Sequence, residues 1–230
     1  MPGAPNLLEL PAWFHLAATF VFAVTGAIAA LRRHYDVVGV FALALVTGVG
    51  GALLRDGLFL QQGPPLVLTD WRYLPVICAG CAVGYLFGAR LDRFNLAFSV
   101  IDALGLAAYG VIGARLSLAV GLSAPAAIFV GVVNATGGGA VRDILTREEP
   151  LMFKAGQFYV LATVSGTALF VLLLRQFQLG AEAAAAWGVG ATFVLRILAL
   201  QYDWRTSPLR WETEPAPAER GPGRPSAPRP

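Results

Sequence analysis

The chain has 230 residues, of which 57% are hydrophobic and 13% are charged, and its formal net charge is +3. A soluble domain is about 45–50% apolar and about 25% charged, so this chain has too little polar surface to cover a water-soluble globule. The composition argues against a cytosolic enzyme, a nucleic-acid-binding module or a disordered protein. It predicts a protein whose solvent is mostly lipid.

A helix that crosses the hydrocarbon core needs about 20 mostly apolar residues, because the core is about 30 Å thick and each residue rises about 1.5 Å. Seven segments meet this requirement, and short breaks with charged or turn-forming residues separate them. No segment shows the ten-residue alternation of apolar and polar side chains that is typical of a barrel strand. The sequence therefore predicts an all-α membrane protein with seven transmembrane helices, at 10–31, 37–60, 71–89, 96–120, 124–145, 158–174 and 181–200.

The placement of Lys and Arg predicts the orientation of these spans, because basic residues are more frequent in cytoplasmic loops. One side of the membrane receives most of them, whereas the other receives Arg72 and Arg175, with Arg115 near its span end. We therefore expect a multi-pass protein of the cell (inner or plasma) membrane, with its N-terminus outside and its C-terminus in the cytoplasm. The basic residues on the cytoplasmic side are Arg32, Arg33, Arg90, Arg93, Arg147, Lys154, Arg205 and Arg210.

The C-terminal segment 205–230 differs in composition from the rest of the chain. It is rich in proline and has hardly any apolar side chain after Trp211. Such a segment cannot bury enough apolar surface to offset the entropy lost on ordering it. We expect it to be a disordered cytoplasmic tail.

The chain contains an internal repeat. Segment 47–56 aligns with segment 134–143 at an offset of 87 residues, as from Arg55 to Arg142, and both contain the pattern Gly-Gly-x-x-x-Arg-Asp. Each copy holds three predicted spans, an odd number, so the two copies have opposite orientations in the membrane. Such inverted repeats are typical of transporters and channels whose pathway lies between the repeats. The expected organisation is a first repeat at 10–90, an inverted second repeat at 95–175 and a seventh helix at 181–204.

Glycine clusters lie deep within the second and fifth spans, at Gly50-Gly51 and at Gly137-Gly138-Gly139. Glycine is a poor helix former, by about 1 kcal/mol relative to alanine. A run of glycines can kink or unwind a helix and expose carbonyl groups that replace the hydration shell of an ion. We expect both helices to break at these clusters beside a pathway. The alternative is close helix packing by small residues.

An Arg-Asp pair follows one turn after each glycine cluster, at Arg55-Asp56 and at Arg142-Asp143. A charge near the membrane interior costs at least about 2.5–3.5 kcal/mol, so it is normally paired, cavity-facing or functional. The pairs can lock the two halves together by salt bridges, or they can line the pathway, and both roles are compatible. In a cation pathway each arginine must be neutralised by a carboxylate or must act as a gate.

Further polar residues lie within the spans. Asp102 begins the fourth span, where it can cap the helix or attract a cation. Thr47, Asn134 and Thr136 lie beside the glycine clusters. Arg196 lies about one turn from the cytoplasmic end of the last span, and we expect its side chain to snorkel to the headgroups.

The residues give no sign of catalysis. The sequence has no histidine near a serine or cysteine nucleophile, no H-E-x-x-H pattern and no spaced carboxylate cluster for a metal. The glycine run at 137–139 lacks the lysine and the preceding strand of a phosphate loop. We expect no enzymatic activity, no cofactor and no bound metal.

The doubled glycine and Arg-Asp motif, within two three-helix repeats plus a seventh helix, resembles the prokaryotic branch of the trimeric intracellular cation channel (TRIC) family. The segments 22–32 and 195–199 look like the first and last helices of that family. The resemblance covers roughly residues 10–204. It implies a homotrimer in the lipid bilayer, with one pore per subunit that passes monovalent cations, chiefly K⁺ and also Na⁺.

The resemblance also implies that the second and fifth helices line each pore. Ala52 stands in the first repeat where the second has Gly139, so the first break is expected to be milder. Some bacterial relatives are described as glycine transporters, so the alternative function is a secondary transporter for a small solute such as glycine. The candidate pathway residues are Thr47, Gly50, Gly51, Arg55, Asp56, Asp102, Asn134, Thr136, Gly137, Gly138, Gly139, Arg142 and Asp143.

Overall fold

The computed structural model describes residues 10–92, 95–154 and 158–204, and all regular structure in this part of the chain is helical. Each predicted span coincides, to within three residues at either end, with one long helix, when α2 is taken together with the helical turn that continues it to Leu60. The predicted tail at 205–230 lies outside the described residues. The long helices are α1 (Ala12–Arg32), α2 (Val37–Leu54), α4 (Tyr73–Asp92), α5 (Asn95–Ala119), α6 (Ala124–Leu145), α7 (Tyr159–Arg175) and α8 (Ala181–Gln201).

Two short elements were not predicted. A π-helical turn, η1 (Arg55–Leu60), continues α2 directly, and a single helical turn, α3 (Leu66–Thr69), precedes α4. π-Helical turns within α-helices are uncommon and occur frequently at functional sites. Here the turn begins at the first of the two Arg-Asp pairs, one turn after the first glycine cluster.

Five of the long helices are long and apolar enough to cross a membrane, namely α1, α2 with η1, α5 from Ala97, α6 and α8. The other two, α4 and α7, contain shorter apolar stretches, Tyr73–Gly88 and Tyr159–Arg175. Local signals set the helix ends: the Asp36 carboxylate caps α2 by accepting a hydrogen bond from the amide of Gly39 at 2.8 Å. Ser123 caps α6 in the same way.

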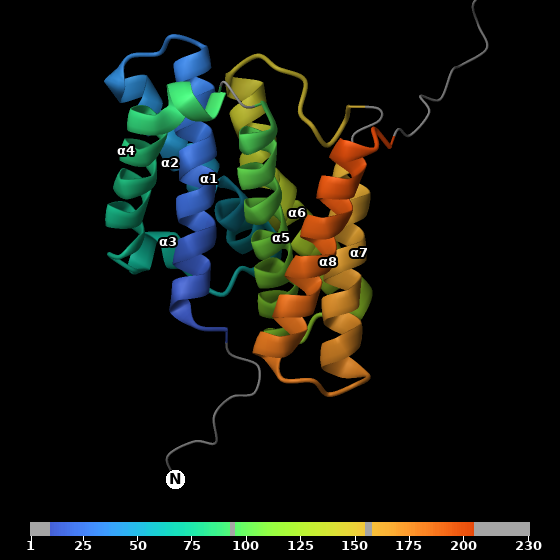
Figure 1. Ribbon diagram of the computed structural model, residues 1–230. Helices are drawn as coiled ribbons and strands as arrows, with labels where there is room; N and C mark the ends of the chain where they lie inside the picture. The colour runs from blue at the N-terminus through green and yellow to red at the C-terminus, as the bar shows by residue number, and fades with distance from the viewer. Residues whose placement is uncertain (1–9, 93–94, 155–157, 205–230) are drawn as a thin grey trace, which may run out of the picture.

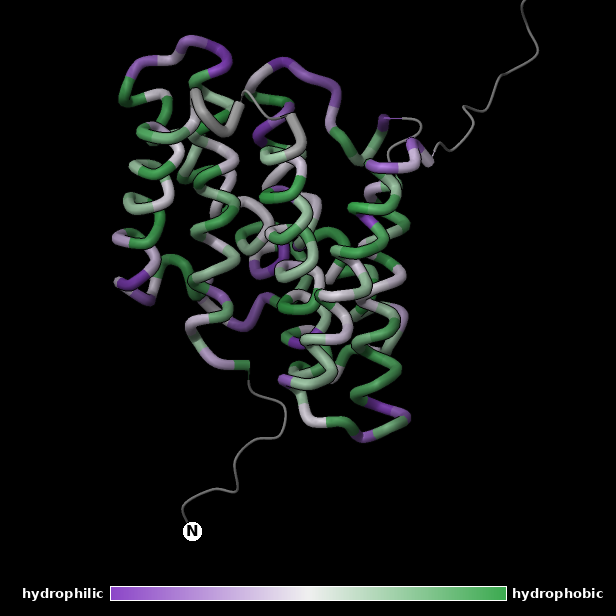
Figure 2. The backbone as a smooth tube through the Cα atoms, viewed as in Figure 1, coloured by the Kyte–Doolittle hydropathy of each residue, from purple (hydrophilic) through white to green (hydrophobic). Residues whose placement is uncertain are grey.

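The helices run roughly side by side between two faces of the molecule (Figure 1). We call the face where α1 begins the N-face and the face where α8 ends the C-face. Large exposed aromatic side chains lie near both faces, with Trp13 and Trp71 at the N-face and Tyr202 and Trp204 at the C-face. Such aromatic side chains are enriched where a membrane protein meets the headgroup region. Hydrophilic residues concentrate in the loops, whereas the helices are mostly apolar (Figure 2).

Close contacts between helices recur at the offset of 87 residues. A Cβ atom added to Gly26 of α1 would lie 2.6 Å from Thr47 Oγ1 of α2, and one added to Gly113 of α5 would lie 2.7 Å from Asn134 Cβ of α6. The second pair of positions is the first pair shifted by the same offset. The packing of α1 on α2 is therefore repeated in the packing of α5 on α6, and α8 packs on α5 and α7.

Candidate functional site

The two glycine clusters face each other where α2 meets α6. A Cβ atom on Gly51 would overlap the carbonyl oxygen of Asn134, and one on Gly138 would overlap the carbonyl oxygen of Thr47. The offset of 87 residues relates Gly51 to Gly138 and Thr47 to Asn134, so the two contacts are equivalent. Because hydrogen is the only side chain on these glycines, the backbones of α2 and α6 approach each other directly. We call this contact the glycine crossing.

The prediction that the glycine clusters break their helices is wrong. Helix α6 continues from Ala124 through Gly137, Gly138 and Gly139 to Leu145, and α2 is α-helical through Gly50 and Gly51. All five glycines are buried. A buried helix keeps its internal hydrogen bonds because no water is present to replace them. Packing, the alternative interpretation, describes these clusters correctly, and the helical irregularity lies one turn later at η1.

Arg142 is the centre of a buried polar cluster towards the C-face, with 1% of its surface exposed. Its guanidinium donates to the carboxylates of Asp143 and Asp102, each at 2.9 Å, and to Thr25 Oγ1 of α1 at 3.2 Å. The hydroxyl of Tyr159 donates to the second oxygen of Asp102 at 3.0 Å. Two carboxylates therefore neutralise this arginine, and the cluster ties α6 to α5, α7 and α1.

Arg196 joins the edge of this cluster. Its guanidinium lies over the ring of Tyr159, 5.0 Å from the ring centre, and 3% of the residue is exposed. The expectation that Arg196 snorkels outward is therefore wrong. The physical reason is the stacking of the cation on an aromatic ring within the bundle, close to Asp102 and Arg142.

Arg55 is the centre of an equivalent cluster towards the N-face, with 2% of its surface exposed. It makes a two-pronged bond to Asp56, at 2.6 and 2.9 Å, and a longer bond to the amide oxygen of Asn134 at 3.4 Å. The amide nitrogen of Asn134 donates to the carbonyl of Tyr109 at 2.6 Å. Arg55 of the first half thus contacts α6 of the second half, as Arg142 contacts Thr25 of the first.

Three functional candidates were missed from sequence: Thr19, Tyr109 and Tyr159. The buried hydroxyl of Tyr109 donates to the carbonyl of Gly48 at 2.6 Å and lies 2.8 Å from Thr19 Oγ1. It therefore holds α5 against α2 beside the glycine crossing. In the sequence, each of these three residues is recognisable only as a hydroxyl within an apolar span. Such a hydroxyl can make a structural hydrogen bond or line a pathway, and the sequence alone does not distinguish the two roles.

A polar cavity of about 280 Å³ opens at the C-face. The buried Asp102, Arg142 and Asp143 lie at its depth, and the exposed Arg32 and Glu148 lie in its lining. We call it the C-face cavity. Its lining is completed by Ala29, Phe98, Ser99, Thr146, Leu151, Lys154, Arg196 and Leu200.

Two cavities of about 610 Å³ and 210 Å³ open at the N-face and share Leu66, Leu116 and Ala119. We call them together the N-face cavities. The larger contains His15 and Arg115, and the smaller contains Asp56. Asp70, at the larger cavity, accepts hydrogen bonds from the Arg72 side chain, and this bonding lowers the pKa of the Asp70 carboxyl, which therefore stays ionised at neutral pH.

The cavities at the two faces are lined by equivalent positions of the two halves. The offset of 87 residues carries His15 onto Asp102 and Asp56 onto Asp143, and it carries Leu116 and Ala119 onto Ala29 and Arg32. Of the candidate pathway residues, Asp102, Arg142 and Asp143 line the C-face cavity and Asp56 lines an N-face cavity. Arg55 lies beside that cavity, bonded to Asp56. The other candidates lie in or beside the glycine crossing: Thr47, Gly50, Gly51, Asn134, Thr136, Gly137, Gly138 and Gly139.

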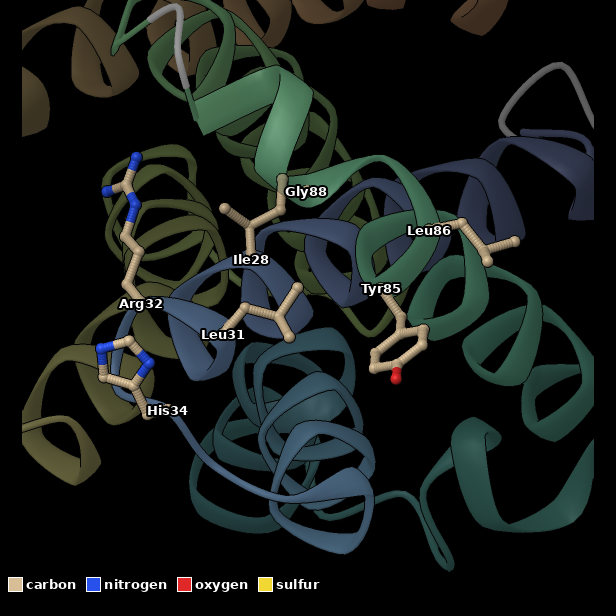
Figure 3. Close-up of a pocket in the computed structure, with 7 residues that line it drawn as sticks. All are labelled: Ile28, Leu31, Arg32, His34, Tyr85, Leu86 and Gly88. Carbon is tan, nitrogen blue, oxygen red and sulfur yellow. The ribbon is translucent and has the colours of Figure 1, made fainter.

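A wider groove of about 800 Å³ lies between α1 and α4 near the C-face (Figure 3). Its described lining is Ile28, Leu31, Arg32, His34, Tyr85, Leu86 and Gly88, none of which is a candidate pathway residue. In Figure 3 the Arg32 and His34 side chains lie well apart from Tyr85, with apolar side chains between them. The groove shares Arg32 with the C-face cavity, but its described lining contains none of the residues that bond Arg142 or Arg55.

Comparisons with known proteins agree with this architecture. The model of the family described as "Glycine transporter" matches two segments, 12–89 and 99–175. A membrane protein of Deinococcus radiodurans, named UPF0126 membrane protein, is 36% identical over 166 residues, which cover 72% of this chain and 77% of that protein. The inner membrane protein YadS of Escherichia coli is 30% identical over 193 residues, covering 83% of this chain and 91% of YadS.

Among solved structures, the TRIC trimeric intracellular cation channel orthologue from Rhodobacter sphaeroides superposes with a TM-score of 0.77 at 32% identity. The match covers 83% of this chain and 96% of that channel. The apolar helices and the membrane relatives support a multi-pass inner-membrane protein, and the similarity to TRIC channels supports a cation channel rather than an enzyme. The chain therefore belongs to the prokaryotic branch of the trimeric intracellular cation channel family.

Proposed function

We propose that this protein is a passive channel for monovalent cations, chiefly K⁺ and also Na⁺, with one pathway in each subunit of a homotrimer embedded in membrane lipid. The observation that carries the proposal is the pair of openings at opposite faces, each of which has charged residues in its lining. The C-face cavity and the N-face cavities open at opposite faces of the same bundle, and each end includes a carboxylate that bonds a buried arginine, Asp143 or Asp56.

The carboxylates give this pathway its preference for cations. An unpaired arginine would repel a cation strongly in a low-dielectric environment. Asp102 and Asp143 bond Arg142, and Asp56 bonds Arg55, so the positive charge is compensated on both sides of the glycine crossing. The glycine crossing is the closed point, and a cation passes when α2 and α6 move apart. Glycine carbonyls would then be available to replace part of the hydration shell of the ion.

We propose further that α1, α2 and α4 form one three-helix repeat, that α5, α6 and α7 form an inverted copy, and that α8 is the seventh transmembrane helix. Three observations support this organisation: the doubled motif, the helix contacts that recur at the same offset, and the two separate matches of one family model. The basic residues Arg32, Arg33 and Lys154 lie in or next to C-face loops, which supports a cytoplasmic C-face.

The orientation makes a direct prediction. A reporter enzyme that works only in the cytoplasm, fused after Trp211, is expected to be active, whereas a periplasm-specific reporter at the same site is expected to be silent. The matched control is the same pair of reporters inserted at Gly121, in the exposed turn between α5 and α6 at the N-face. The control should give the opposite pattern. Periplasmic activity after Trp211 would contradict the assigned faces.

Single-channel recording tests the function itself. Purified full-length protein in a planar bilayer with KCl on both sides is expected to give discrete unitary currents that reverse near the K⁺ equilibrium potential in a KCl gradient. The second candidate is a secondary transporter for a small solute such as glycine, which the family description favours. Saturable glycine uptake into proteoliposomes without unitary currents would favour that candidate and would rule out the channel.

A further inference from the structure

The two ends of the proposed pathway differ at one pair of equivalent positions. Asp102 lies in the C-face cavity, and the position 87 residues earlier, His15, lies in the larger N-face cavity. Asp102 accepts hydrogen bonds from Arg142 and Tyr159. The same place in the first half therefore carries an imidazole where the second half carries a carboxylate.

The consequence appears in the bonding of the two arginines. Within the described part of the chain, two carboxylates, Asp102 and Asp143, bond Arg142, whereas Asp56 and the neutral amide of Asn134 bond Arg55. The charge of Arg142 is thus compensated twice and that of Arg55 once. Hydrogen bonds connect His15 to the Arg55 cluster: its carbonyl accepts from Thr19, the Thr19 hydroxyl lies 2.8 Å from the Tyr109 hydroxyl, and the carbonyl of Tyr109 accepts from Asn134.

Each end also has one further buried arginine. Arg115 lines the larger N-face cavity with 8% of its surface exposed, and Arg196 lines the C-face cavity with 3% exposed. These two arginines do not distinguish the ends. The difference in charge next to the glycine crossing therefore comes from His15 at the N-face end and Asp102 at the C-face end.

We propose that His15 restricts cation entry from the N-face, because it occupies the place at which a second carboxylate would make the Arg55 cluster net negative, as Asp102 does for the Arg142 cluster. This inference rests on the proposed channel function. A fixed charge in a narrow vestibule changes the local concentration of the permeant ion, and dissolved salt screens the effect. His15 therefore sets how the current divides between the two directions.

The test is His15→Asp in the full-length protein, recorded in planar bilayers with symmetric 20–50 mM KCl, with an antibody against a tag after Pro230 marking the C-face of each channel. Current carried by K⁺ from the N-face is expected to rise roughly two- to five-fold relative to the opposite direction, as for one charge at vestibule distance. At about 1 M KCl, where the Debye length is about 3 Å, the effect should largely disappear.

Two further variants keep the test decisive. His15→Asn, which adds no charge, is expected to leave the current ratio at its wild-type value. Ala12→Asp places a carboxylate in the same cavity at the first turn of α1, where an acidic residue is compatible with the helix dipole, and should give a smaller change of the same sign. If His15→Asp does not assemble, Ala12→Asp still tests whether a carboxylate in this cavity changes the current ratio.

Unitary currents with an unchanged ratio in His15→Asp and Ala12→Asp would overturn the role of His15 and leave the channel function intact. An equal rise in His15→Asn would also overturn it, because size rather than charge would then be responsible. Absence of any unitary current from the wild-type protein would contradict the channel function and, with it, this inference.

Discussion

Replacing Gly51 by alanine is expected to lower the apparent melting temperature of the detergent-solubilised protein by roughly 5–10 °C and to abolish cation flux. The added methyl group would overlap the carbonyl oxygen of Asn134 and lie 3.1 Å from its carbonyl carbon. Both atoms belong to the backbone of α6, so no side-chain rotation relieves the overlap. Overpacking costs about 1–3 kcal/mol or more, and each kcal/mol shifts the melting temperature by about 2–4 °C in a chain of this size.

Gly190→Ala is the matched control for this experiment. Gly190 lies in α8. Apart from the neighbouring backbone of α8 itself, no described atom lies within 4 Å of a Cβ atom added there. Alanine is a better helix former by about 1 kcal/mol, so this variant should keep or slightly raise the melting temperature. Fluorescence-detected size-exclusion chromatography after a heating series measures both variants. A Gly51→Ala protein as stable as wild type, with normal flux, would contradict the glycine crossing.

The extent of the helices could be predicted from the sequence because it depends on local properties. The length of each apolar run, the charged breaks and caps such as Asp36 are all contained within a few residues. The internal repeat was also visible, since it needs only a comparison of the chain with itself. The π-helical turn at Arg55–Leu60 was not predicted, because no local pattern distinguishes it from the end of an α-helix.

The role of the glycines could not be decided from the sequence because it depends on a distant partner. A glycine cluster serves equally for a helix break and for a close helix contact. The difference lies in the position of Asn134 opposite Gly51 and of Thr47 opposite Gly138, and these contacts bridge 83 and 91 residues of sequence. A carboxylate beside each arginine was one of two alternatives that the sequence left open, the other being a gate. Tyr159 and Thr25 were not recognised as members of the Arg142 cluster.

Replacing Arg142 by methionine is expected to have the second large effect, a fall in melting temperature of about 10 °C together with loss of flux. Methionine fills a similar volume but leaves Asp102 and Asp143 without the guanidinium that bonds both of them. Breaking a buried ion pair by removing one partner costs about 3–5 kcal/mol, because the remaining charge stays buried. Thermal unfolding and liposome flux of the purified variant measure the two losses.

Arg33→Met is the control for the loss of an ion pair as such. Arg33 bonds Glu148 at 2.7 Å between exposed side chains at the C-face, and exposed pairs contribute about 0.2–1 kcal/mol. Its melting temperature should therefore fall by no more than about 4 °C, with flux retained. Equal losses in the two arginine variants would show that burial of the Arg142 cluster is not what makes it important.

The double variant Arg142→Met/Asp102→Leu separates the ion pair from the space that it fills. If the cost of Arg142→Met comes mainly from a stranded carboxylate, removing that carboxylate as well should recover part of the stability. Residues in direct contact show coupling energies of about 0.5–3 kcal/mol, so the double variant should be more stable than the sum of the single changes predicts. Flux should stay low, because both groups border the C-face cavity. Additive losses would contradict a buried, mutually compensating pair.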